Sequence, residues 1–308
     1  MQNGKKVLAT TSTFSKQSSA ALELLGAEGY EAIRNPFERK LTEDELIDLL
    51  EEHRPVGLLG GTEPITRAAL ETAKSYLRAV SRVGVGWDNV DHAAARELGI
   101  PVSRTQGILD QAVAELTVGM ILAALRRIAH QDRRIRSGTW KKEMGGLLSS
   151  RVLGILGFGS IGQRVGELVN AIGARVLFHD PVPRDVSWAE ARTLEDLLRQ
   201  ADILTIHASG SGQLLGSTEL ELLSKPGVML VNTARGGMVD EEALYGMLSA
   251  GKITYACLDV FAREPYEGPL RNLDNVLLTP HIGSYAAEAR VEMEVMAVRN
   301  LLQALGGS

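Results

Sequence analysis

Residues 152–162 read Val-Leu-Gly-Ile-Leu-Gly-Phe-Gly-Ser-Ile-Gly, and this stretch decides the fold. Its first half is aliphatic without polar alternation, which is typical of a strand buried on both faces of a parallel sheet. The three glycines that follow have the spacing of a dinucleotide-binding turn. Gly157 permits a tight turn, Gly159 lets a pyrophosphate approach the backbone, and Gly162 lets the next helix pack on its strand.

The segment after the turn predicts a helix whose first amides, at Ser160 and Ile161, would bind phosphates. A second strand is expected at 175–179 and ends at Asp180. A carboxylate there accepts hydrogen bonds from both ribose hydroxyls of an adenosine and repels a 2′-phosphate. The pattern therefore favours NAD over NADP. The alternative is a glycine-rich turn of some other α/β domain, with Asp180 a solvated strand end.

Composition limits the class of protein. The chain has 308 residues, enough for two domains at about 150 residues each. Its net charge of −5 gives no basic footprint for nucleic acid. The longest apolar run, 116–125, is shorter than the ~18 residues of a membrane span, and the first residues lack the apolar core of a signal peptide.

Cys257 is the only cysteine, which excludes an intrachain disulfide and a cysteine-based metal cluster. A cytoplasmic location is the default for such a chain, and Cys257 is expected to be a buried small hydrophobe. The histidines show no metal-ligand spacing, so no metal is expected.

Strands and helices alternate along both halves of the chain, which predicts two parallel α/β domains. Thr42 and Glu45 form a capping-box pattern, and 103–136 is expected to contain one long helix with an apolar stripe at 112–124. A final helix, 285–305, could return to the first domain. The other strands are expected at 5–9, 56–59, 77–83, 100–102, 203–206, 228–232, 253–258 and 275–279, and the other helices at 17–25, 42–52, 66–73, 90–98, 194–200, 218–224 and 241–250.

Three polar residues follow apolar strands late in the chain, where an open α/β sheet binds ligands. Arg235 would bind a substrate carboxylate and polarise its carbonyl. His281 would exchange the hydroxyl proton, and Glu264 would orient the imidazole and favour its protonated form. Taken singly, Glu264 is also compatible with a solvated loop charge. Together the three suit the reversible oxidation of a 2-hydroxy acid.

With these segments in hand, the chain resembles the D-2-hydroxyacid dehydrogenase family, nearest to its phosphoglycerate dehydrogenase branch. The resemblance implies an α/β architecture of two Rossmann-like or flavodoxin-like parallel-sheet domains. It implies a split substrate domain, residues 1–102 and 284–308, around an NAD-binding Rossmann domain at 103–283. The matching segments are 84–91, 114–117, 157–162 with Asp180, 232–236 with 239–240, 258–265 and 280–283.

The resemblance also implies roles for individual residues. Arg235, Glu264 and His281 form its catalytic set, and the backbone of Val83, Gly84 and Val85 would bind the substrate carboxylate beside Arg235. The implied partners are NAD and a small 2-hydroxy or 2-oxo acid, with a homodimer packed on the long helix. Beyond the glycine turn and Asp180, the implied cofactor contacts are His207, Thr233, Ala234, Asp259 and His281.

Two segments depart from the family pattern. The loop 208–212 reads Ala-Ser-Gly-Ser-Gly where a proline, an aliphatic and a threonine are usual, and Gln106 stands where proline is common. The chain stops at Ser308, so the regulatory extension of many phosphoglycerate dehydrogenases is not expected.

The substrate stays open at this point. Thr10–Thr13 with Lys16, and Arg82 and Arg104 near strand ends, offer hydroxyls and cations for a phosphate, as in 3-phosphoglycerate and 3-phosphohydroxypyruvate. The same residues are equally ordinary turn and capping chemistry. Glyoxylate or hydroxypyruvate would need a less basic pocket. A non-catalytic NAD-sensing interaction protein of the same fold is the alternative from another class.

Overall fold

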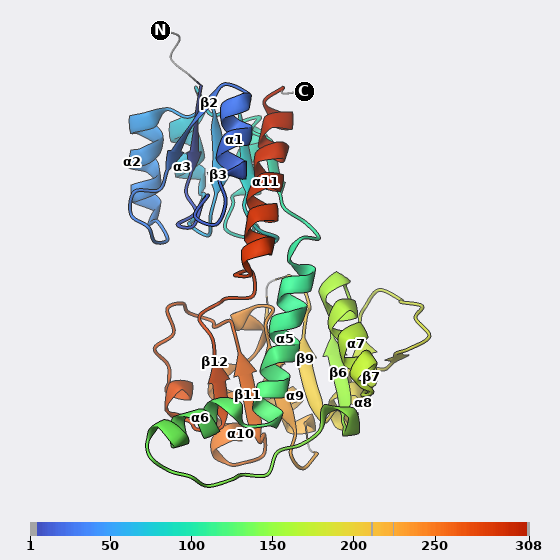
Figure 1. Cartoon of the computed structure of the whole chain (residues 1–308). Helices are drawn as coiled ribbons and strands as arrows, with labels where there is room; N and C mark the ends of the chain where they lie inside the picture. The colour runs from blue at the N-terminus through green and yellow to red at the C-terminus, as the bar shows by residue number, and fades with distance from the viewer. Residues whose placement is uncertain (1–4, 211, 224, 307–308) are drawn as a thin grey trace. The chain divides into compact units, whose positions relative to one another are not determined.

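The computed structural model describes residues 5–210, 212–223 and 225–306. The chain divides into two compact units, Met1–Leu109 with Ser284–Ser308, and Asp110–Gly283. We call them the first and the second unit; the boundaries expected from the sequence are 102/103 and 283/284. Figure 1 shows both units as sheets flanked by helices. Within the described residues, no helix is long and apolar enough to cross a membrane.

The first unit contains a five-stranded parallel sheet in the order β2-β1-β3-β4-β5. The strand order reverses between β1 and β3, and this is the kind of position where open α/β sheets bind ligands. The strands are β1 (Lys5–Ala9), β2 (Tyr30–Arg34), β3 (Gly57–Gly60), β4 (Ala79–Arg82) and β5 (Val102–Arg104).

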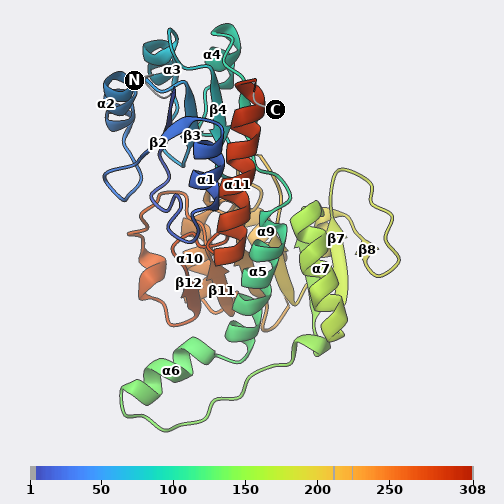
Figure 2. The same ribbon diagram turned by 45° about the horizontal axis from the view of Figure 1, so that its top comes forward.

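The helices of the first unit include the last helix of the chain. This helix, α11 (Ala287–Ala304), lies beside α1 in both views and against β3, β4 and β5 (Figures 1 and 2). Its packing is close, because a Cβ added at Gly57 would lie 2.9 Å from Cδ2 of Leu301. The other helices are α1 (Ala20–Ala27), α2 (Glu43–His53), α3 (Arg67–Ala73) and α4 (His92–Glu97).

The second unit contains a seven-stranded parallel sheet in the order β12-β11-β10-β9-β6-β7-β8. Its order reverses between β6 and β9, and β9, β10 and β11 are buried along their whole length. The predicted architecture of two parallel-sheet α/β domains is confirmed. The strands are β6 (Val152–Leu156), β7 (Arg175–His179), β8 (Glu190–Ala191), β9 (Ile203–Ile206), β10 (Met229–Asn232), β11 (Tyr255–Leu258) and β12 (Val276–Leu278).

Helices cover both faces of this second sheet, as the right-handed connections of parallel strands require. The helix expected around 218–224 is α9, and Ser224 lies outside the described residues. The helices are α5 (Leu109–Leu125), α6 (Ile128–Arg136), α7 (Ser160–Ile172), α8 (Leu194–Gln200), α9 (Ser217–Leu222) and α10 (Glu241–Ser249), with 3₁₀ turns η1 (Leu148–Ser150), η2 (Gly236–Met238) and η3 (Pro269–Asn272).

Several expectations about the elements need correction. The long helix expected within 103–136 is α5, and it includes the stripe at 112–124. The separate helix α6 was not expected: Arg127 adopts a left-handed conformation with φ 53°, which separates α5 from α6. This helix break is not predictable from the sequence, because neither glycine nor proline stands at that position. Strand β2 was missed, because it is an edge strand that has no fully buried residue. The short strand β8 was missed as well. The Thr42 capping box and the burial of Cys257 are confirmed.

Candidate active site

The glycine turn between β6 and α7 requires glycine for two different reasons. Gly157 has φ +91°, and a Cβ there would lie 2.4 Å from the backbone nitrogen of Ala208, just past β9. A Cβ at Gly162 would lie 2.2 Å from the Gly157 carbonyl oxygen. No atom lies within 4 Å of a Cβ built at Gly159, so the backbone there is open to a ligand. The turn therefore packs closely against the chain after β9 at Gly157, while its backbone at Gly159 is accessible to a ligand.

Asp180 lies at this turn. Its Oδ2 accepts a hydrogen bond of 2.6 Å from the Phe158 amide, and its Oδ1 accepts one of 2.8 Å from Val182. Gly159 is the N-cap of α7 and supplies no side chain to the first amides of the helix, at Ser160 and Ile161. The described turn therefore combines helix amides without a side-chain cap and a half-buried carboxylate, which fits the phosphates and ribose of a dinucleotide.

His207 follows β9 beside the same turn. Burial lowers its pKa to about 3, so the imidazole is neutral. Its Nε2 lies 2.9 Å from the Thr205 hydroxyl, while Nδ1 is buried and has no hydrogen-bond partner among the described residues. A buried polar nitrogen without a partner costs free energy unless a ligand or water satisfies it. His207 therefore also fits the neighbourhood of a bound cofactor.

Arg235 comes from the turn that follows β10. Asn232 donates from Nδ2 to the Arg235 carbonyl at 2.8 Å and accepts at Oδ1 from the Ala234 amide at 3.0 Å. The next residue, Gly236, is pressed against the neighbouring loop, since a Cβ there would lie 1.8 Å from the Phe261 carbonyl carbon. The Arg235 side chain is exposed and donates to the Ala234 carbonyl at 2.8 Å. This arrangement holds the guanidinium beside the loop that carries Glu264.

Glu264 and His281 are hydrogen-bonded to each other. Oε2 of Glu264 lies 2.9 Å from Nδ1 of His281, and Oε1 accepts from the Phe261 amide at 3.1 Å. The pKa of His281 is raised, chiefly by this hydrogen bond with Glu264, although partial burial acts against it. His281 has φ +54°, a backbone conformation that only a few per cent of non-glycine residues adopt. The pair leaves Nε2 of a half-exposed, readily protonated imidazole available for proton transfer.

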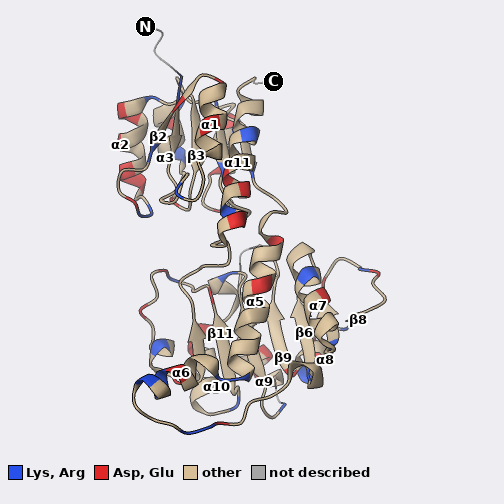
Figure 3. Cartoon of the chain, viewed as in Figure 1, with Lys and Arg blue, Asp and Glu red and all other residues tan. Residues whose placement is uncertain are grey.

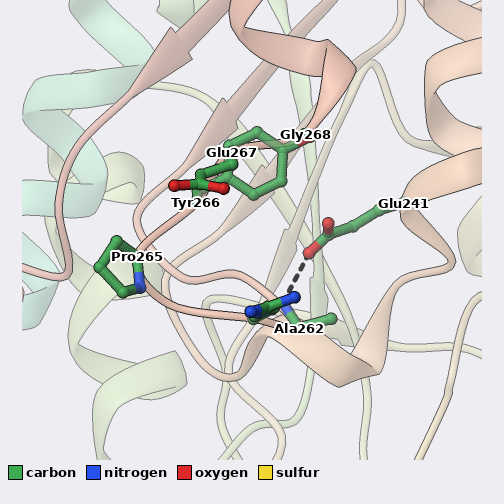
Figure 4. A pocket seen from close by; sticks show the side chains of 7 residues that line it. Glu241, Ala262, Pro265, Tyr266, Glu267 and Gly268 are labelled. Carbon is green, nitrogen blue, oxygen red and sulfur yellow. Dashed lines mark hydrogen bonds between the residues drawn. The ribbon is translucent and has the colours of Figure 1, made fainter.

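The loop of Glu264 is also fixed from α10. The Glu241 carboxylate accepts from the Ala262 amide at 2.6 Å, drawn as the dashed line in Figure 4. Tyr266 stacks on Phe261 with ring centroids 4.4 Å apart. Glu241 and Tyr266 border a pocket of about 290 Å³ on this loop. These contacts restrict the backbone on each side of Glu264.

Asp259 has a surrounding that the sequence does not reveal. Its side chain is fully buried at the end of β11 and accepts three hydrogen bonds. Oδ1 accepts from the Thr279 hydroxyl at 2.6 Å and from the Ile282 amide at 2.8 Å, and Oδ2 accepts from the Gly283 amide at 2.9 Å. All three donors flank His281. The carboxylate predicted to contact the cofactor is thus bonded to the turn of the histidine.

The remaining predicted cofactor residues lie at the end of β10. The Thr233 hydroxyl lies 2.9 Å from that of Thr117, on α5, and is mostly buried. The residues that sequence reasoning missed here are Asn232, Glu241 and Thr279. Asn232 and Thr279 carry a recognisable signal, because each is a polar residue at the end of an apolar strand; Glu241 carries none. Among the described residues, no group of three or more His, Cys, Asp or Glu side chains is arranged to hold a metal ion.

Val83–Val85, predicted to bind the substrate carboxylate, lie in the first unit after β4. Gly84 has φ +150°, and a Cβ there would lie 2.4 Å from Nη1 of Arg82. On the other side, Arg104 donates to the Val85 carbonyl at 3.1 Å and stacks over the Trp87 ring at 4.3 Å. The described loop therefore has a guanidinium on each side. The structure brings Arg235, Glu264 and His281 together in the second unit.

Comparison with known proteins identifies the family. Residues 118–283 match the model of the D-isomer specific 2-hydroxyacid dehydrogenase NAD-binding domain. Over 245 residues the chain is 42% identical to a glyoxylate reductase of Aeropyrum pernix, covering 73% of this chain and 72% of the relative. It is 36% identical to a hydroxypyruvate reductase of Thermotoga maritima, covering 86% and 89%. It is also 36% identical to a D-3-phosphoglycerate dehydrogenase of Methanocaldococcus jannaschii, covering 87% of this chain but 52% of the relative.

A solved structure has the same fold. The TT0316 protein from Thermus thermophilus superposes with a TM-score of 0.89 at 36% identity, covering 98% of this chain and 97% of that one. The predictions of the family, of the NAD cofactor and of an oxidoreductase are confirmed by these findings. The chain belongs to the D-isomer specific 2-hydroxyacid dehydrogenases, a family of NAD-dependent enzymes.

Proposed function

We propose that this enzyme reduces a small unphosphorylated 2-oxo acid, glyoxylate or hydroxypyruvate, to the D-2-hydroxy acid, and that Arg235, Glu264 and His281 carry the chemistry. The observation that supports it most is the 2.9 Å hydrogen bond between Glu264 and His281, on the loops that follow β11 and β12. It gives an imidazole of raised pKa in the same unit as an exposed guanidinium.

Each of the three side chains has a distinct task in this proposal. Arg235 donates paired hydrogen bonds to the substrate carboxylate and polarises the 2-oxo group. His281 delivers a proton from Nε2 to the oxygen during reduction and takes it back in oxidation. Glu264 keeps Nδ1 hydrogen-bonded and stabilises the imidazolium. NAD, when bound, supplies or accepts the hydride.

We assign the cofactor to the second unit. The amides of Ser160 and Ile161 would donate hydrogen bonds to its phosphates, and the carboxylate of Asp180 would accept hydrogen bonds from its ribose hydroxyls. On the nicotinamide side, the backbone of Thr233 and Ala234 and the buried nitrogen of His207 are the proposed contacts. The remaining members of this set are Gly157, Gly159, Gly162, Asp259 and His281.

In the first unit, the loop Val83–Val85 is the proposed partner of the substrate carboxylate, chiefly through the Val85 amide. The Val83 and Gly84 amides already donate to the carbonyls of Gly60 at 2.9 Å and Arg82 at 3.0 Å. The guanidiniums of Arg82 and Arg104 flank this loop and make it electropositive. A short acid needs no cation beyond these two and Arg235, because its carboxylate is its only charge.

The loop after β1 supports an unphosphorylated substrate. Two of its polar groups already have partners: the Thr10 hydroxyl donates to the Leu59 carbonyl at 3.2 Å, and Lys16 pairs with Glu38 at 2.9 Å. The buried Thr11 hydroxyl has no partner among the described residues. The buried carboxylate of Glu63 lies against Thr10 and would repel a phosphate. The phosphoglycerate reading, for which this loop was the sequence argument, is therefore the weaker of the two.

We also propose a homodimer in the cytoplasm. The segment after α5 carries exposed apolar side chains, among them Ile128, Ile135 and Trp140, the last 83% exposed. Figure 3 shows α6 with blue Lys and Arg segments. Arg127 and Arg134 bind Glu143, and they hold its pKa at about 2. Mixed apolar and paired charged groups of this kind suit a contact with a second copy.

The test of substrate class is a panel of 2-oxo acids. NADH oxidation is measured with glyoxylate, hydroxypyruvate, phosphohydroxypyruvate and pyruvate. We expect kcat/KM to be highest with glyoxylate or hydroxypyruvate. A preference for phosphohydroxypyruvate contradicts the proposed substrate. Absence of turnover on every acid, with NADH still bound, favours the non-catalytic alternative.

The role of His281 has its own test. We expect His281→Ala to lower kcat by about 10²–10⁴-fold, which is the contribution of a positioned acid–base group. NADH affinity, measured by fluorescence titration, should stay close to that of the wild type. Unchanged turnover in this variant would remove His281 from the mechanism.

A further inference from the structure

The chain between β7 and β8, residues 181–189, is tied to the second unit at both of its ends. At its start, the amide of Val182 donates to Oδ1 of Asp180 at 2.8 Å. At its end, β8 pairs with β7, and Arg175 forms two hydrogen bonds with Glu190, at 2.7 and 3.0 Å. Figure 2 shows a loop that leaves β7 and returns at β8. We call residues 181–189 the β7–β8 loop.

Trp188 packs inward from this loop. Its ring is partly buried against the apolar core of the second unit, and a Cβ added at Gly166 would lie 2.7 Å from Cζ3 of the indole. Gly166 lies on α7, the helix that begins at the glycine turn. A helix interior disfavours glycine, and here the missing side chain leaves the space that the ring occupies. The tryptophan thus holds the β7–β8 loop against α7.

The same ring reaches the glycine turn. The Phe158 and Trp188 ring centroids lie 5.6 Å apart, and Phe158 stacks on Phe178 of β7 at 4.0 Å. The Phe158 side chain is fully buried, and its amide donates to Oδ2 of Asp180 at 2.6 Å. One residue of the turn is therefore joined through its amide to the carboxylate proposed for the ribose and through its ring to the β7–β8 loop.

We propose that Trp188 is a positioning residue for the adenosine half of the cofactor. By packing on α7 and on Phe158, it fixes the β7–β8 loop beside the glycine turn. The loop in turn fixes Val182, which bonds to the Asp180 carboxylate and is 52% exposed. A loop that is already ordered loses less conformational entropy when the cofactor binds, which raises affinity. This inference rests on the proposed assignment of the ribose to Asp180.

A purely structural role for Trp188 makes a different prediction. Loss of core packing lowers the stability of the whole second unit, and it does not distinguish the two halves of the cofactor. Loss of positioning weakens only those ligands that carry the adenosine half. Reduced nicotinamide mononucleotide has the hydride-donating ring without the adenosine, whereas ADP-ribose has the adenosine without the nicotinamide. These two compounds therefore separate the two roles.

Trp188→Leu keeps an apolar side chain but removes the ring that lies against Phe158 and Gly166. We expect the dissociation constants of NADH and ADP-ribose to rise by about 5–20-fold, because binding must now also order the loop. With reduced nicotinamide mononucleotide as the hydride donor, kcat/KM should stay within about twofold of the wild type. Calorimetry measures the affinities without a 2-oxo acid. Unchanged affinity for ADP-ribose, or an equal loss with the mononucleotide, overturns the inference.

The other side of the contact gives a second test. Gly166→Ala would place a Cβ 2.7 Å from the indole and displace the ring. We expect this variant to weaken ADP-ribose binding as Trp188→Leu does. In the Trp188→Leu background the same substitution should cost no further affinity, because the ring is already gone; additive losses contradict the inference. Gly166→Ala carries the test if Trp188→Leu does not fold, and unchanged ADP-ribose affinity then overturns the inference.

The matched control is Tyr255→Leu. Tyr255 belongs to the same apolar core but is the first residue of β11, whereas the proposed cofactor residues follow the carboxyl ends of the strands. This variant should lower the midpoint of a denaturant melt and leave ADP-ribose affinity unchanged. A loss of affinity equal to that of Trp188→Leu means that core damage alone explains the effect, which overturns the inference.

The proposed function can fail separately from this inference. A wild-type enzyme that binds ADP-ribose but reduces none of the 2-oxo acids contradicts the proposed function, while the effect of Trp188→Leu on ADP-ribose affinity still decides the inference. A wild-type enzyme that does not bind ADP-ribose overturns the inference directly.

Discussion

Both sheets of this enzyme reverse their strand order once. Glycine backbone lies at the reversal in the second unit, whereas polar side chains lie at the reversal in the first unit. In the second unit the reversal lies between β6 and β9, and bare glycine backbone lies there against the chain after β9. In the first unit the reversal lies between β1 and β3, and side chains fill it. Thr10 and Glu63 both accept from the Gly61 amide at 2.8 Å.

The loop after β1 continues this pattern. Arg290 and Glu294, both on α11 and both buried, bond to the hydroxyl of Thr13 and to the amide of Ser15. The amides that would face a ligand in the second unit are here satisfied by the protein itself. A βα turn therefore becomes a ligand site when no side chain of the protein satisfies its donors, and topology alone does not decide this.

A side chain placed in the open turn of the second unit is expected to have the largest effect. Gly162→Ala would bring a Cβ to 2.2 Å from the Gly157 oxygen, so the backbone must shift. We expect the free energy of unfolding to fall by about 3 kcal/mol and NADH binding to be lost. Denaturant melts and fluorescence titration measure the two effects.

The control is Gly159→Ala, where the Cβ meets nothing within 4 Å and φ is −74°. This variant should keep its stability and lose affinity for NADH alone. If Gly159→Ala is as unstable as Gly162→Ala, the two glycines do not have separate roles.

The filled loop gives the second test. Glu294→Gln keeps an acceptor for the Ser15 amide but leaves Arg290 buried without its counter-charge. We expect a loss of about 2 kcal/mol of stability with NADH affinity unchanged. The exposed Glu23, which bonds to Ser19, is the matched control, and its glutamine variant should lose little. Weakened NADH binding in Glu294→Gln would contradict the division between the two reversals.

Asp180→Ala tests which residue selects the cofactor, and its expected effect is small. The substitution removes the carboxylate that favours ribose hydroxyls over a 2′-phosphate, so the preference for NADH over NADPH should fall roughly tenfold, or about 1.4 kcal/mol. The ratio of kcat/KM for the two cofactors measures it. A preference equal to that of the wild type would mean that another residue of the open turn selects the cofactor.

The open turn is predictable from the sequence because its backbone conformation and close contacts require particular residue types. Only glycine satisfies φ +91° at position 157 and the close approach at position 162, and the carboxylate after β7 follows at the expected distance. The filled loop was harder to predict. Its hydroxyls suggested a phosphate site. The groups that bind this loop come instead from α11, far along the chain: Arg290 donates to the Thr13 hydroxyl, and Glu294 accepts from the Ser15 amide.

In the candidate active site, too, some features can be predicted from the sequence and others cannot. The polar residues at the ends of β10, β11 and β12 are visible in the sequence, since each follows an apolar run. The contacts that fix them are not, because Asp259 and Thr279 are linked only once two strands lie in register. The break at Arg127 depends on a backbone conformation that no residue type there requires.

The division of the chain has a consequence for its synthesis. The second unit is one continuous segment, Asp110–Gly283, while the first needs α11, which buries eight residues of its own against the opening strands and helices. A ribosome makes the chain from its first residue onward, and domains fold as their segments emerge. The opening strands must therefore remain without the helix that covers their apolar face until α11, which follows the whole second unit, has been made. The unit begun first is finished last.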